Sequence, residues 1–476
     1  MIELGLARIF RLLARTPLPW RAIHVAGTNG KGSICAYVTG MLSAYNVSTF
    51  RSESDQSALK HGRFNSPHLI DRWDCITIDG ETISESIFRQ VEARLIELNE
   101  NEGIGASEFE LLTATAFEIF TQENVDVAVI EVGMGGRLDA TNILGQSSGW
   151  DKPDVAGVSI DQFRPKPLAT AVSTIALDHQ GFLGSTLEQI STEKAGIMKP
   201  GVPVVLAPND ATVTQNLLNI AKKVGVSQII RAEDTQGYES IWSHTQKPQL
   251  FDNEQVRKQN SAMAFSLTWL ALQQLHRLHD HIPSALTALI SSFREVPSHT
   301  IWPGRVQDVS IECITGYKPL ILIDGAHNAE SAEALANTVR KRTYNDRPII
   351  WVVAASYGKD VRSMLQHFLS IDADQRRTHP PCVIATRFGP VDGMPWVRAM
   401  SPVEIVDQVR QTTNQCKSAN FSVKPSYQTA VNDLRDALEE ACTIAKKWDG
   451  LVVVAGSLYL VGDVLRMVRE HGGDIS

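Results

Sequence analysis

The residues best placed to do chemistry lie in a glycine-rich segment near the start of the chain. The sequence AGTNGKGS spans residues 26–33 and directly follows the apolar run Ala22–Val25. A buried strand that ends in such a loop, with a helix after it, can turn backbone N–H groups toward a phosphate. Lys31 would add a positive charge, and Thr28 or Ser33 would offer an oxygen to Mg²⁺. One glycine separates Lys31 from Ser33, which departs from a strict Walker A motif, but the pattern still favours phosphate binding over a plain helix N-terminus.

A second chemical cluster, EVGMGGRLDATN, begins at Glu131, directly after the apolar run Val125–Ile130. In open α/β sheets, ligands gather beyond the carboxyl ends of the strands. A carboxylate there is a natural ligand for nucleotide-bound Mg²⁺. A solvated glutamate beside a glycine-rich turn would explain Glu131 equally well on its own, and the neighbouring Arg137 and Asp139 favour the functional interpretation.

Polar residues also follow a third apolar run and a helical pattern. Asp178 and His179 come after the run Thr174–Leu177, which we expect to be a strand, and Lys194 lies in the segment EKAG. A histidine after a strand usually has a structural partner, and a lysine on a helix is usually solvated. These residues gain a function only if they face the same cavity as Glu131.

The fourth cluster lies in the last third of the chain. Arg305 ends the turn WPGR, where a guanidinium suits phosphate or carboxylate recognition. Asp324 and His327 belong to DGAHN, which ends an apolar strand and begins a helix, so they would form a polar rim at the sheet edge. The alternative is that Asn328 is a simple helix N-cap.

Apolar runs alternate with helical patterns along the whole chain, which predicts parallel α/β layers. The segment from Val296 to Gly304, rich in Pro, Gly and Trp, looks like a linker. We therefore expect an N-terminal domain over 1–297 and a C-terminal, doubly wound domain over 298–476. Residues 145–167 are interpreted as a surface insertion, the first fifteen residues as a short helix, and Gln428–Lys447 as one helix.

Composition sets the class of protein. The chain has 476 residues, 43% hydrophobic and 21% charged, as is typical of a soluble globular protein. A net charge of −8 argues mildly against general nucleic-acid binding, and no apolar run approaches the roughly 20 residues that span a bilayer. Six scattered cysteines without CxxC spacing favour reduced thiols in the cytoplasm. We expect neither nucleic acid nor membrane as a partner, and a mitochondrial association stays open.

Seven motifs occur in an order that resembles the folylpolyglutamate synthase and dihydrofolate synthase family of the Mur ligase superfamily. They are AGTNGKGS (26–33), NSPHL (65–69), EVGMGGRLDATN (131–142), LDHQGFLG (177–184), EKAGIMKPG (193–201), PGR (303–305) and DGAHN (324–328). The resemblance implies a P-loop-type ATPase domain with a mainly parallel sheet, followed by a Rossmann-like C-terminal domain that completes the glutamate ligase. It also implies an ATP-dependent amide ligase in which the γ-phosphoryl group of ATP activates a carboxylate as an acyl phosphate.

The same resemblance assigns roles to residues. Those expected to bind nucleotide are Gly27, Thr28, Asn29, Gly30, Lys31, Gly32, Ser33, Asn260, Arg305 and Asp324. Those expected at two Mg²⁺ sites are Ser33, Ser66, Glu131, His179 and Lys194, and those expected to be catalytic are Lys31, His179, Lys194 and His327. Lys194 matches a lysine that family members carry as a carbamate. Asn260 matches an asparagine near the adenine, although the His-Gln pair usual before it is replaced here around Val256-Arg257.

Details of the motifs favour the dihydrofolate synthase branch, which joins L-glutamate to 7,8-dihydropteroate. Asn29 in the glycine-rich loop is similar to the residue in bacterial and dihydrofolate synthase forms, and this loop begins close to the first residue. The run over 62–86 is similar to fungal dihydrofolate synthases. The alternatives are a folylpolyglutamate synthase or a bifunctional enzyme, and, more remotely, a nucleotide-binding protein without ligase chemistry. The family suggests a monomer.

Overall fold

The computed structural model describes residues 5–53, 57–146, 164–232, 254–278, 283–343, 347–370, 382–418 and 427–475. The chain divides into two compact units. The first extends to Thr300 but leaves out Leu69–Arg72, and the second consists mainly of the chain from Ile301 onward together with those four residues.

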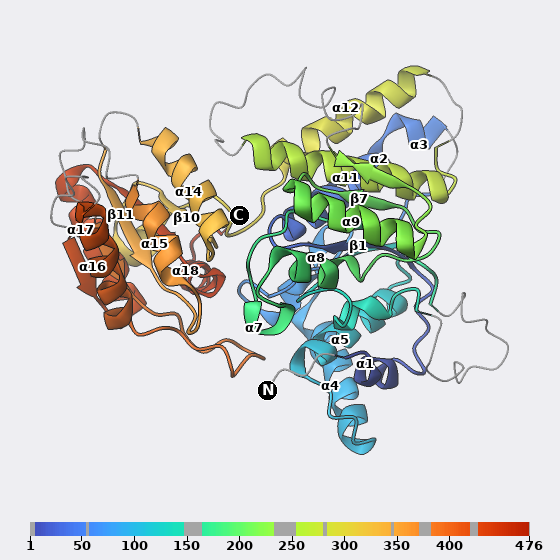
Figure 1. The fold of residues 1–476 in the computed structure, drawn as a ribbon, viewed down its shortest axis with the longest axis horizontal. Helices are drawn as coiled ribbons and strands as arrows, with labels where there is room; N and C mark the ends of the chain where they lie inside the picture. The colour runs from blue at the N-terminus through green and yellow to red at the C-terminus, as the bar shows by residue number, and fades with distance from the viewer. Residues whose placement is uncertain are drawn as a thin grey trace. The chain divides into compact units, whose positions relative to one another are not determined.

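The first unit is built on an eight-stranded sheet in the order β4-β3-β2-β5-β1-β6-β7-β8 (Figure 1). Its strands are β1 (Arg21–Ala26), β2 (His61–Phe64), β3 (Ile76–Ile78), β4 (Glu81–Thr82), β5 (Val127–Glu131), β6 (Ala169–Val172), β7 (Val204–Leu206) and β8 (Ile229–Arg231). The six strands from β2 to β8 in that order run parallel, and β3 and β4 form an antiparallel edge. The carboxyl ends of β2, β5, β1 and β6 therefore meet at one edge of the sheet.

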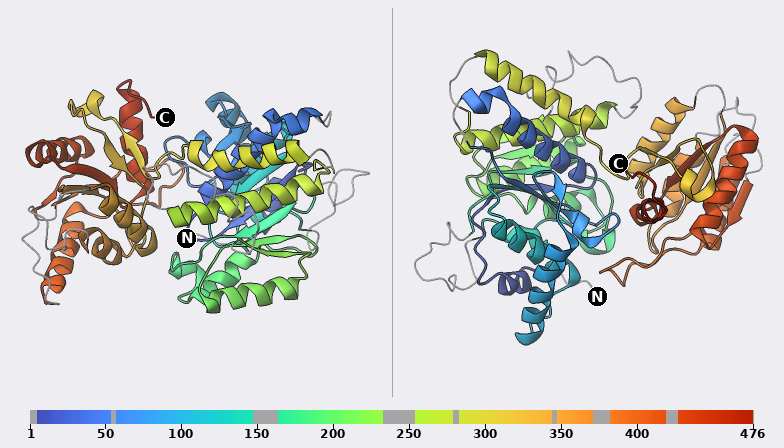
Figure 2. Two further views of the ribbon diagram at one scale, coloured as in Figure 1. Left: turned by 90° about the horizontal axis from the view of Figure 1, so that it is seen from above. Right: turned by 180° about the vertical axis from the view of Figure 1, so that it is seen from behind.

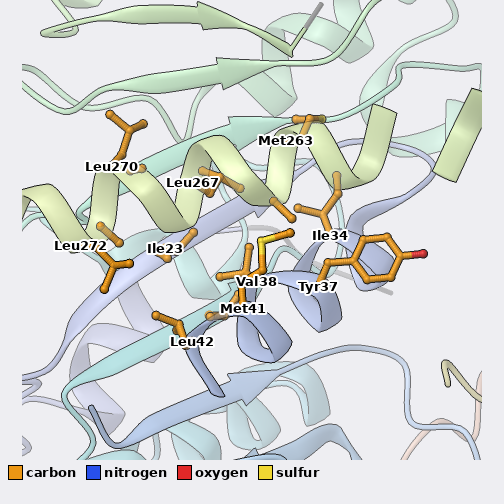
Figure 3. Close-up of a cluster of buried hydrophobic side chains, with 14 of the residues drawn as sticks. Ile23, Ile34, Tyr37, Val38, Met41, Leu42, Met263, Leu267, Leu270 and Leu272 are labelled. Carbon is orange, nitrogen blue, oxygen red and sulfur yellow. The ribbon is translucent and has the colours of Figure 1, made fainter. Parts of the chain in front are cut away.

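Helices cover both faces of this sheet. They are α1 (Ala7–Leu12), α2 (Lys31–Val47), α3 (Thr49–Glu53), α4 (Glu85–Asn101), α5 (Glu108–Gln122), α7 (Gln180–Leu183), α8 (Leu187–Ala195), α9 (Ala211–Val224), α11 (Glu254–Gln274) and α12 (Pro283–His299), with 3₁₀ turns η1 (Arg72–Cys75) and η2 (Ala140–Ile143). Side chains alternate along β1, so that Ile23 and Val25 pack against α2, α11 and α12, while Ala22 joins a core with α1, α4 and α5. Figure 3 shows Ile23 beside Val38 and Met41 of α2 and Leu267 of α11.

The second unit, whose chain from Ile301 onward runs from yellow to red in Figure 2, has a six-stranded sheet in the order β13-β12-β11-β14-β10-β9. Its strands are β9 (Gln307–Val309), β10 (Ile321–Ile323), β11 (Ile349–Val353), β12 (Cys382–Ala385), β13 (Tyr427–Ala430) and β14 (Leu451–Ala455). Its helices are α13 (Glu312–Thr315), α14 (Ala329–Arg342), α15 (Val361–Ser370), α16 (Pro402–Ser418), α17 (Leu434–Trp448) and α18 (Leu458–Glu470). All strand pairs are parallel except β9–β10. One face packs on α14, α15 and α16, and the other on α13, α17 and α18.

Residues Leu69–Arg72 join the second unit because they are fastened to α18. Arg466 donates to the carbonyl oxygen of Ile70 at 2.6 Å, and Arg469 forms a two-pronged ion pair with Asp71. Gly462 permits this close approach, since a Cβ there would lie 1.9 Å from the carbonyl oxygen of Leu69.

The expected α/β class with two mostly parallel sheets is confirmed, and three element assignments are corrected. Thr174–Leu177 is not a strand: β6 ends at Val172, and the residues after it form a loop beside the glycine-rich turn. The segment 428–447 contains β13 and α17 rather than one helix, because Asp433 caps a new helix within it. The expected linker overlaps α12, which continues to His299.

Most of the expected insertion over 145–167 lies outside the described residues. The short N-terminal helix is confirmed as α1. Within the part of the chain that the structure covers, no helix is long and apolar enough to cross a membrane.

Candidate active site

The glycine-rich loop joins β1 to α2 in a conformation that depends on two glycines. Gly27 has φ of 145°, and a Cβ at this position would lie 1.7 Å from Oγ of Ser173. Gly30 caps α2 with φ of 88°, a left-handed conformation that favours glycine. The N-terminus of α2 and its free backbone N–H groups therefore lie at the end of the loop, where an anion is stabilised.

Hydrogen bonds hold the loop against the segment after β6. The backbone N–H of Thr28 donates to the carbonyl oxygen of Thr174 at 2.8 Å, and Oγ of Ser173 donates to the carbonyl oxygen of Asn29 at 2.7 Å. The shape of the loop is thus held by hydrogen bonds within the protein. Such preorganisation lowers the cost of binding.

Lys31 and Glu131 are brought together at this edge of the sheet. Val25 pairs with Glu131 in the parallel register of β1 and β5, and α2 begins at Lys31 just beyond β1. The Nζ atom of Lys31 lies 3.7 Å from Oε1 of Glu131 and 3.3 Å from the carbonyl oxygen of Thr28, to which it donates. Both side chains are largely buried. At 3.7 Å the ion pair is loose, which leaves Lys31 able to turn toward an incoming phosphate.

Asn65 and Ser66 contact the other oxygen of Glu131. Asn65 donates from Nδ2 to Oε2 of Glu131 at 2.8 Å, and the backbone N–H of Ser66 donates to the same atom at 3.4 Å. Oγ of Ser66 is buried and has no hydrogen-bond partner among the described residues. The sequence interpretation gave Asn65 no role, although its position just after β2, the strand next to β5, is the signal that places it here.

Lys194 lies on the last turn of α8 and points at the glycine-rich loop. Its side chain is 4% exposed, and Nζ donates to the carbonyl oxygen of Gly27 at 2.7 Å. Burial, reinforced by the positive charge of Lys31, lowers the pKa of Lys194 to about 7, against the opposing effect of Asp178 and Asp139. A buried amine with this pKa is substantially neutral at physiological pH, and so is nucleophilic.

His179 lies at the N-cap of the short helix α7 in a left-handed conformation, with φ of 52°. Its Nε2 atom is 3.6 Å from Oδ2 of Asp178, and the backbone N–H of His179 donates to Oδ1 of the same carboxylate at 2.9 Å. Asp178, which the sequence interpretation left without a role, therefore faces both His179 and the charge of Lys194.

The residues expected to bind metal offer mainly oxygen. Within the described ranges, no group of three or more His, Cys, Asp and Glu side chains could hold a metal ion by itself. The unpartnered hydroxyl of Ser66 beside the carboxylate of Glu131 does fit a hard cation such as Mg²⁺, which keeps several waters and takes other ligands from phosphates. Ser33, the third residue of α2, lies on the same first helical turn as Lys31.

Asn260 of α11 lies against the glycine-rich loop. A Cβ on Gly30 would come within 2.6 Å of Oδ1 of Asn260, and the asparagine is largely buried. The structure thus brings Asn260 to the glycine-rich loop.

In the second unit, Arg305, Asp324 and His327 lie close together at the carboxyl end of β10. Asp324 accepts from the backbone N–H groups of Val306 and Ala326, both at 2.8 Å. Burial raises its pKa, although Arg305 and these hydrogen bonds oppose the rise. Nδ1 of His327 lies 2.8 Å from the carbonyl oxygen of Gly325. Asn328 is the N-cap of α14, as the alternative interpretation proposed.

Comparison with known proteins places the whole chain in one family. The family model "Dihydrofolate synthetase, C-terminal domain" matches residues 307–467. The chain is 34% identical over 482 residues to "Probable dihydrofolate synthetase" of Schizosaccharomyces pombe, covering 98% of this chain and 99% of the relative. It is 32% identical over 483 residues to "Dihydrofolate synthetase" of Saccharomyces cerevisiae, covering 99% of each.

Solved structures share the fold. The Mycobacterium tuberculosis folylpolyglutamate synthase complexed with ADP and AMPPCP superimposes with a TM-score of 0.72 at 23% identity, covering 99% of this chain and 96% of that one. A bifunctional folylpolyglutamate synthase/dihydrofolate synthase from Yersinia pestis, complexed with AMPPNP and a Mn ion, gives 0.68 at 24% identity, covering 98% and 94%. The chain therefore belongs to the dihydrofolate synthase and folylpolyglutamate synthase family of ATP-dependent acid–amino-acid ligases.

Proposed function

We propose that this enzyme ligates L-glutamate to 7,8-dihydropteroate and yields 7,8-dihydrofolate, ADP and phosphate. The observation that carries the proposal is the match over nearly the full length to two curated relatives named dihydrofolate synthetase. The geometry around Lys31 and Glu131 supports the same chemistry, because it joins a phosphate loop to a carboxylate and an unpartnered hydroxyl.

The reaction has two group transfers. A carboxylate oxygen of dihydropteroate attacks the γ-phosphorus of ATP, the bond to the bridging oxygen breaks, and ADP leaves. The amine of glutamate then attacks the acyl phosphate carbon and loses a proton, and phosphate leaves as the amide forms. A carboxylate is a poor electrophile until its oxygen becomes a good leaving group, so positioning and charge stabilisation supply most of the catalysis.

In this proposal the first unit holds the triphosphate. The loop from Gly27 to Ser33 would cradle the phosphates, Lys31 would move from Glu131 to the outer phosphate oxygens, and Asn260 would lie near the nucleotide. Bound Mg²⁺ would neutralise charge on the phosphates. Glu131, Ser33 and Ser66 are the side chains that would hold it, with Asn65 fixing the carboxylate of Glu131.

Lys194 would act as a carbamate. Its neutral amine adds to CO₂ with loss of one proton, which converts a neutral group into an anion beside Lys31. That anion and His179 would support a second divalent ion. The low pKa of Lys194 and its burial favour this modification, because the reacting form is the free amine.

In the second unit, Arg305 and His327 would contact the phosphates or the acyl phosphate. Asp324 would shape the turn that meets the ribose or phosphate end of ATP, because both of its oxygens already accept backbone N–H groups. The monomeric state and a cytoplasmic location, the latter based on the cysteine pattern, remain predictions. The five cysteines whose side chains are described form no disulfide with one another.

Phosphate release with two acceptors tests the proposal. Purified enzyme with ATP, Mg²⁺ and L-glutamate is given 7,8-dihydropteroate or tetrahydrofolate in parallel, and the glutamylated product is identified by mass. We expect turnover with dihydropteroate. Activity with tetrahydrofolate alone would identify a folylpolyglutamate synthase, activity with both would identify a bifunctional enzyme, and ATP binding without glutamate incorporation would reject ligase chemistry.

A further inference from the structure

A second buried lysine, Lys199, lies five residues after Lys194 and has no part in the chemistry above. Its side chain is 5% exposed, and burial lowers its pKa to about 8. Its Nζ atom donates to Oδ1 of Asn142 at 2.7 Å, which is its one hydrogen-bond partner in the described ranges. Burying an amine without a carboxylate partner is costly, so the arrangement needs a compensating function.

Asn142 joins two segments of backbone. From Nδ2 it donates to the carbonyl oxygen of Arg137 at 3.0 Å and to that of Gly196 at 3.1 Å. Arg137 belongs to the glycine-rich segment after β5, and Gly196 is the C-cap of α8, the helix that carries Lys194. Because a lysine can only donate, Lys199 fixes the amide with its oxygen toward Nζ and its nitrogen toward the two carbonyls.

The two segments that Asn142 joins are packed backbone against backbone. A Cβ on Gly136 would lie 2.8 Å from the carbonyl oxygens of Glu193 and Lys194, and a Cβ on Gly196 would lie 2.6 Å from Cα of Arg137. The backbone N–H of Arg137 also donates to the carbonyl oxygen of Glu193 at 2.8 Å. The bridge at Asn142 adds to these contacts at the same seam, so we expect its loss to loosen the end of α8.

A shift of α8 would displace Lys194, which reaches the carbonyl oxygen of Gly27 from the last turn of this helix. We propose that Lys199 is a positioning residue for Lys194, acting through Asn142 to hold the end of α8 against the glycine-rich segment. The consequence for catalysis rests on the proposed function, whereas the consequence for the backbone does not. Substituting a residue that orients a metal-site group without touching the metal typically lowers activity by about 10- to 100-fold.

Hydrogen exchange of the intact, ligand-free enzyme tests the structural part. In Lys199→Met, which keeps the apolar stem and removes the donor, we expect the amide of Arg137 to exchange about 10-fold faster, along with peptides that cover 187–198. Lys199→Gln keeps a hydrogen-bond donor on a side chain one atom shorter and should restore most of the protection of these amides from exchange. Lys166→Met is the matched control, because Lys166 is exposed and donates to the carbonyl oxygen of Pro200 at 3.0 Å.

Steady-state kinetics tests the catalytic part. Lys199→Met should lower kcat about 10- to 100-fold with KM for ATP changed by less than about threefold, since the phosphate loop itself is intact. A merely structural role would lower the active fraction and the melting temperature without this split. Lys199→Gln should recover most of kcat, and Lys166→Met should match the wild type.

Three results would overturn the inference. They are wild-type exchange at the Arg137 amide in Lys199→Met, a kcat of Lys199→Met equal to that of Lys166→Met, and a Lys199→Gln enzyme as slow as Lys199→Met. If Lys199→Met does not fold, Lys199→Gln decides: protection and kcat close to the control support the inference, and a large loss of either rejects it. A wild-type enzyme without ligase activity would reject the proposed function, and the exchange result alone would then decide the inference.

Discussion

Glu131 in the first unit and Asp324 in the second arise from the same sequence signal but have different surroundings. Each is an acid at the carboxyl end of an apolar strand: Glu131 is the last residue of β5, and Asp324 directly follows β10. Both oxygens of Asp324 accept backbone N–H groups at 2.8 Å, whereas Glu131 has one oxygen in a loose 3.7 Å pair with Lys31. An acid at the end of a strand can therefore have both oxygens held by backbone donors or keep one oxygen available to a ligand, and the segments packed around it decide which.

The comparison predicts that removing Lys31 has the largest effect. Lys31→Ala should lower kcat for ligation by about 10³-fold, because one positioned charge on the transferring phosphoryl group is lost. Stopped-assay phosphate release with dihydropteroate measures this. Near-normal turnover would remove the phosphate-loop assignment.

Neutralising each acid should separate the two regions. Glu131→Gln should lower kcat about 10²-fold with little loss of stability, because it removes a charge that is available to a ligand. Asp324→Asn should instead cost about 1–3 kcal/mol of stability, since an amide nitrogen would face a backbone N–H. Urea unfolding and steady-state kinetics on both variants check this prediction. If both variants lost the same kcat and the same stability, the two acids would not differ in role.

Removing the Lys194 side chain should lower kcat about as much as Glu131→Gln does, and added carboxylates should partly reverse the loss. Lys194→Ala should lower kcat about 10²-fold if a carbamate supports the second ion. Added acetate or formate should then restore part of the rate by supplying the missing carboxylate. An active wild-type enzyme that shows no carbamate carbon by ¹³C NMR in the presence of ¹³C-bicarbonate would contradict the carbamate.

The last prediction concerns the pH dependence of stability. The pKa of Lys194 is about 7 in the folded protein and about 10.5 unfolded. Between these values the unfolded state holds more protons, so this group makes stability rise with pH, by up to about 1.4 kcal/mol per pH unit, and has no slope below pH 7. Relative to the wild type, Lys194→Met should gain most below pH 7 and progressively less toward pH 10. Urea unfolding of both proteins at pH 6, 8 and 9.5 measures the difference, and a constant difference would show that Lys194 titrates normally.

The sequence predicted the layered fold and the elements around the glycine-rich loop because apolar periodicity and glycine spacing are local signals. It assigned Thr174–Leu177 to a strand because a loop that packs beside a sheet edge is also apolar. It gave no role to Asn65, Asp178 or Lys199, since their contacts with Glu131, His179 and Asn142 depend on strand order and helix packing. Likewise, the roles of Asp324 and Glu131 could not be separated without the loop hydrogen bonds.

The most direct test of the central claim follows the carboxylate oxygens of the acceptor. Dihydropteroate labelled with ¹⁸O at both carboxylate positions is incubated with enzyme, ATP, Mg²⁺ and L-glutamate. Activation as an acyl phosphate predicts one ¹⁸O in each released phosphate and one retained in the amide of the product. Released phosphate without ¹⁸O, at a rate equal to amide formation, would contradict phosphoryl transfer to the acceptor carboxylate.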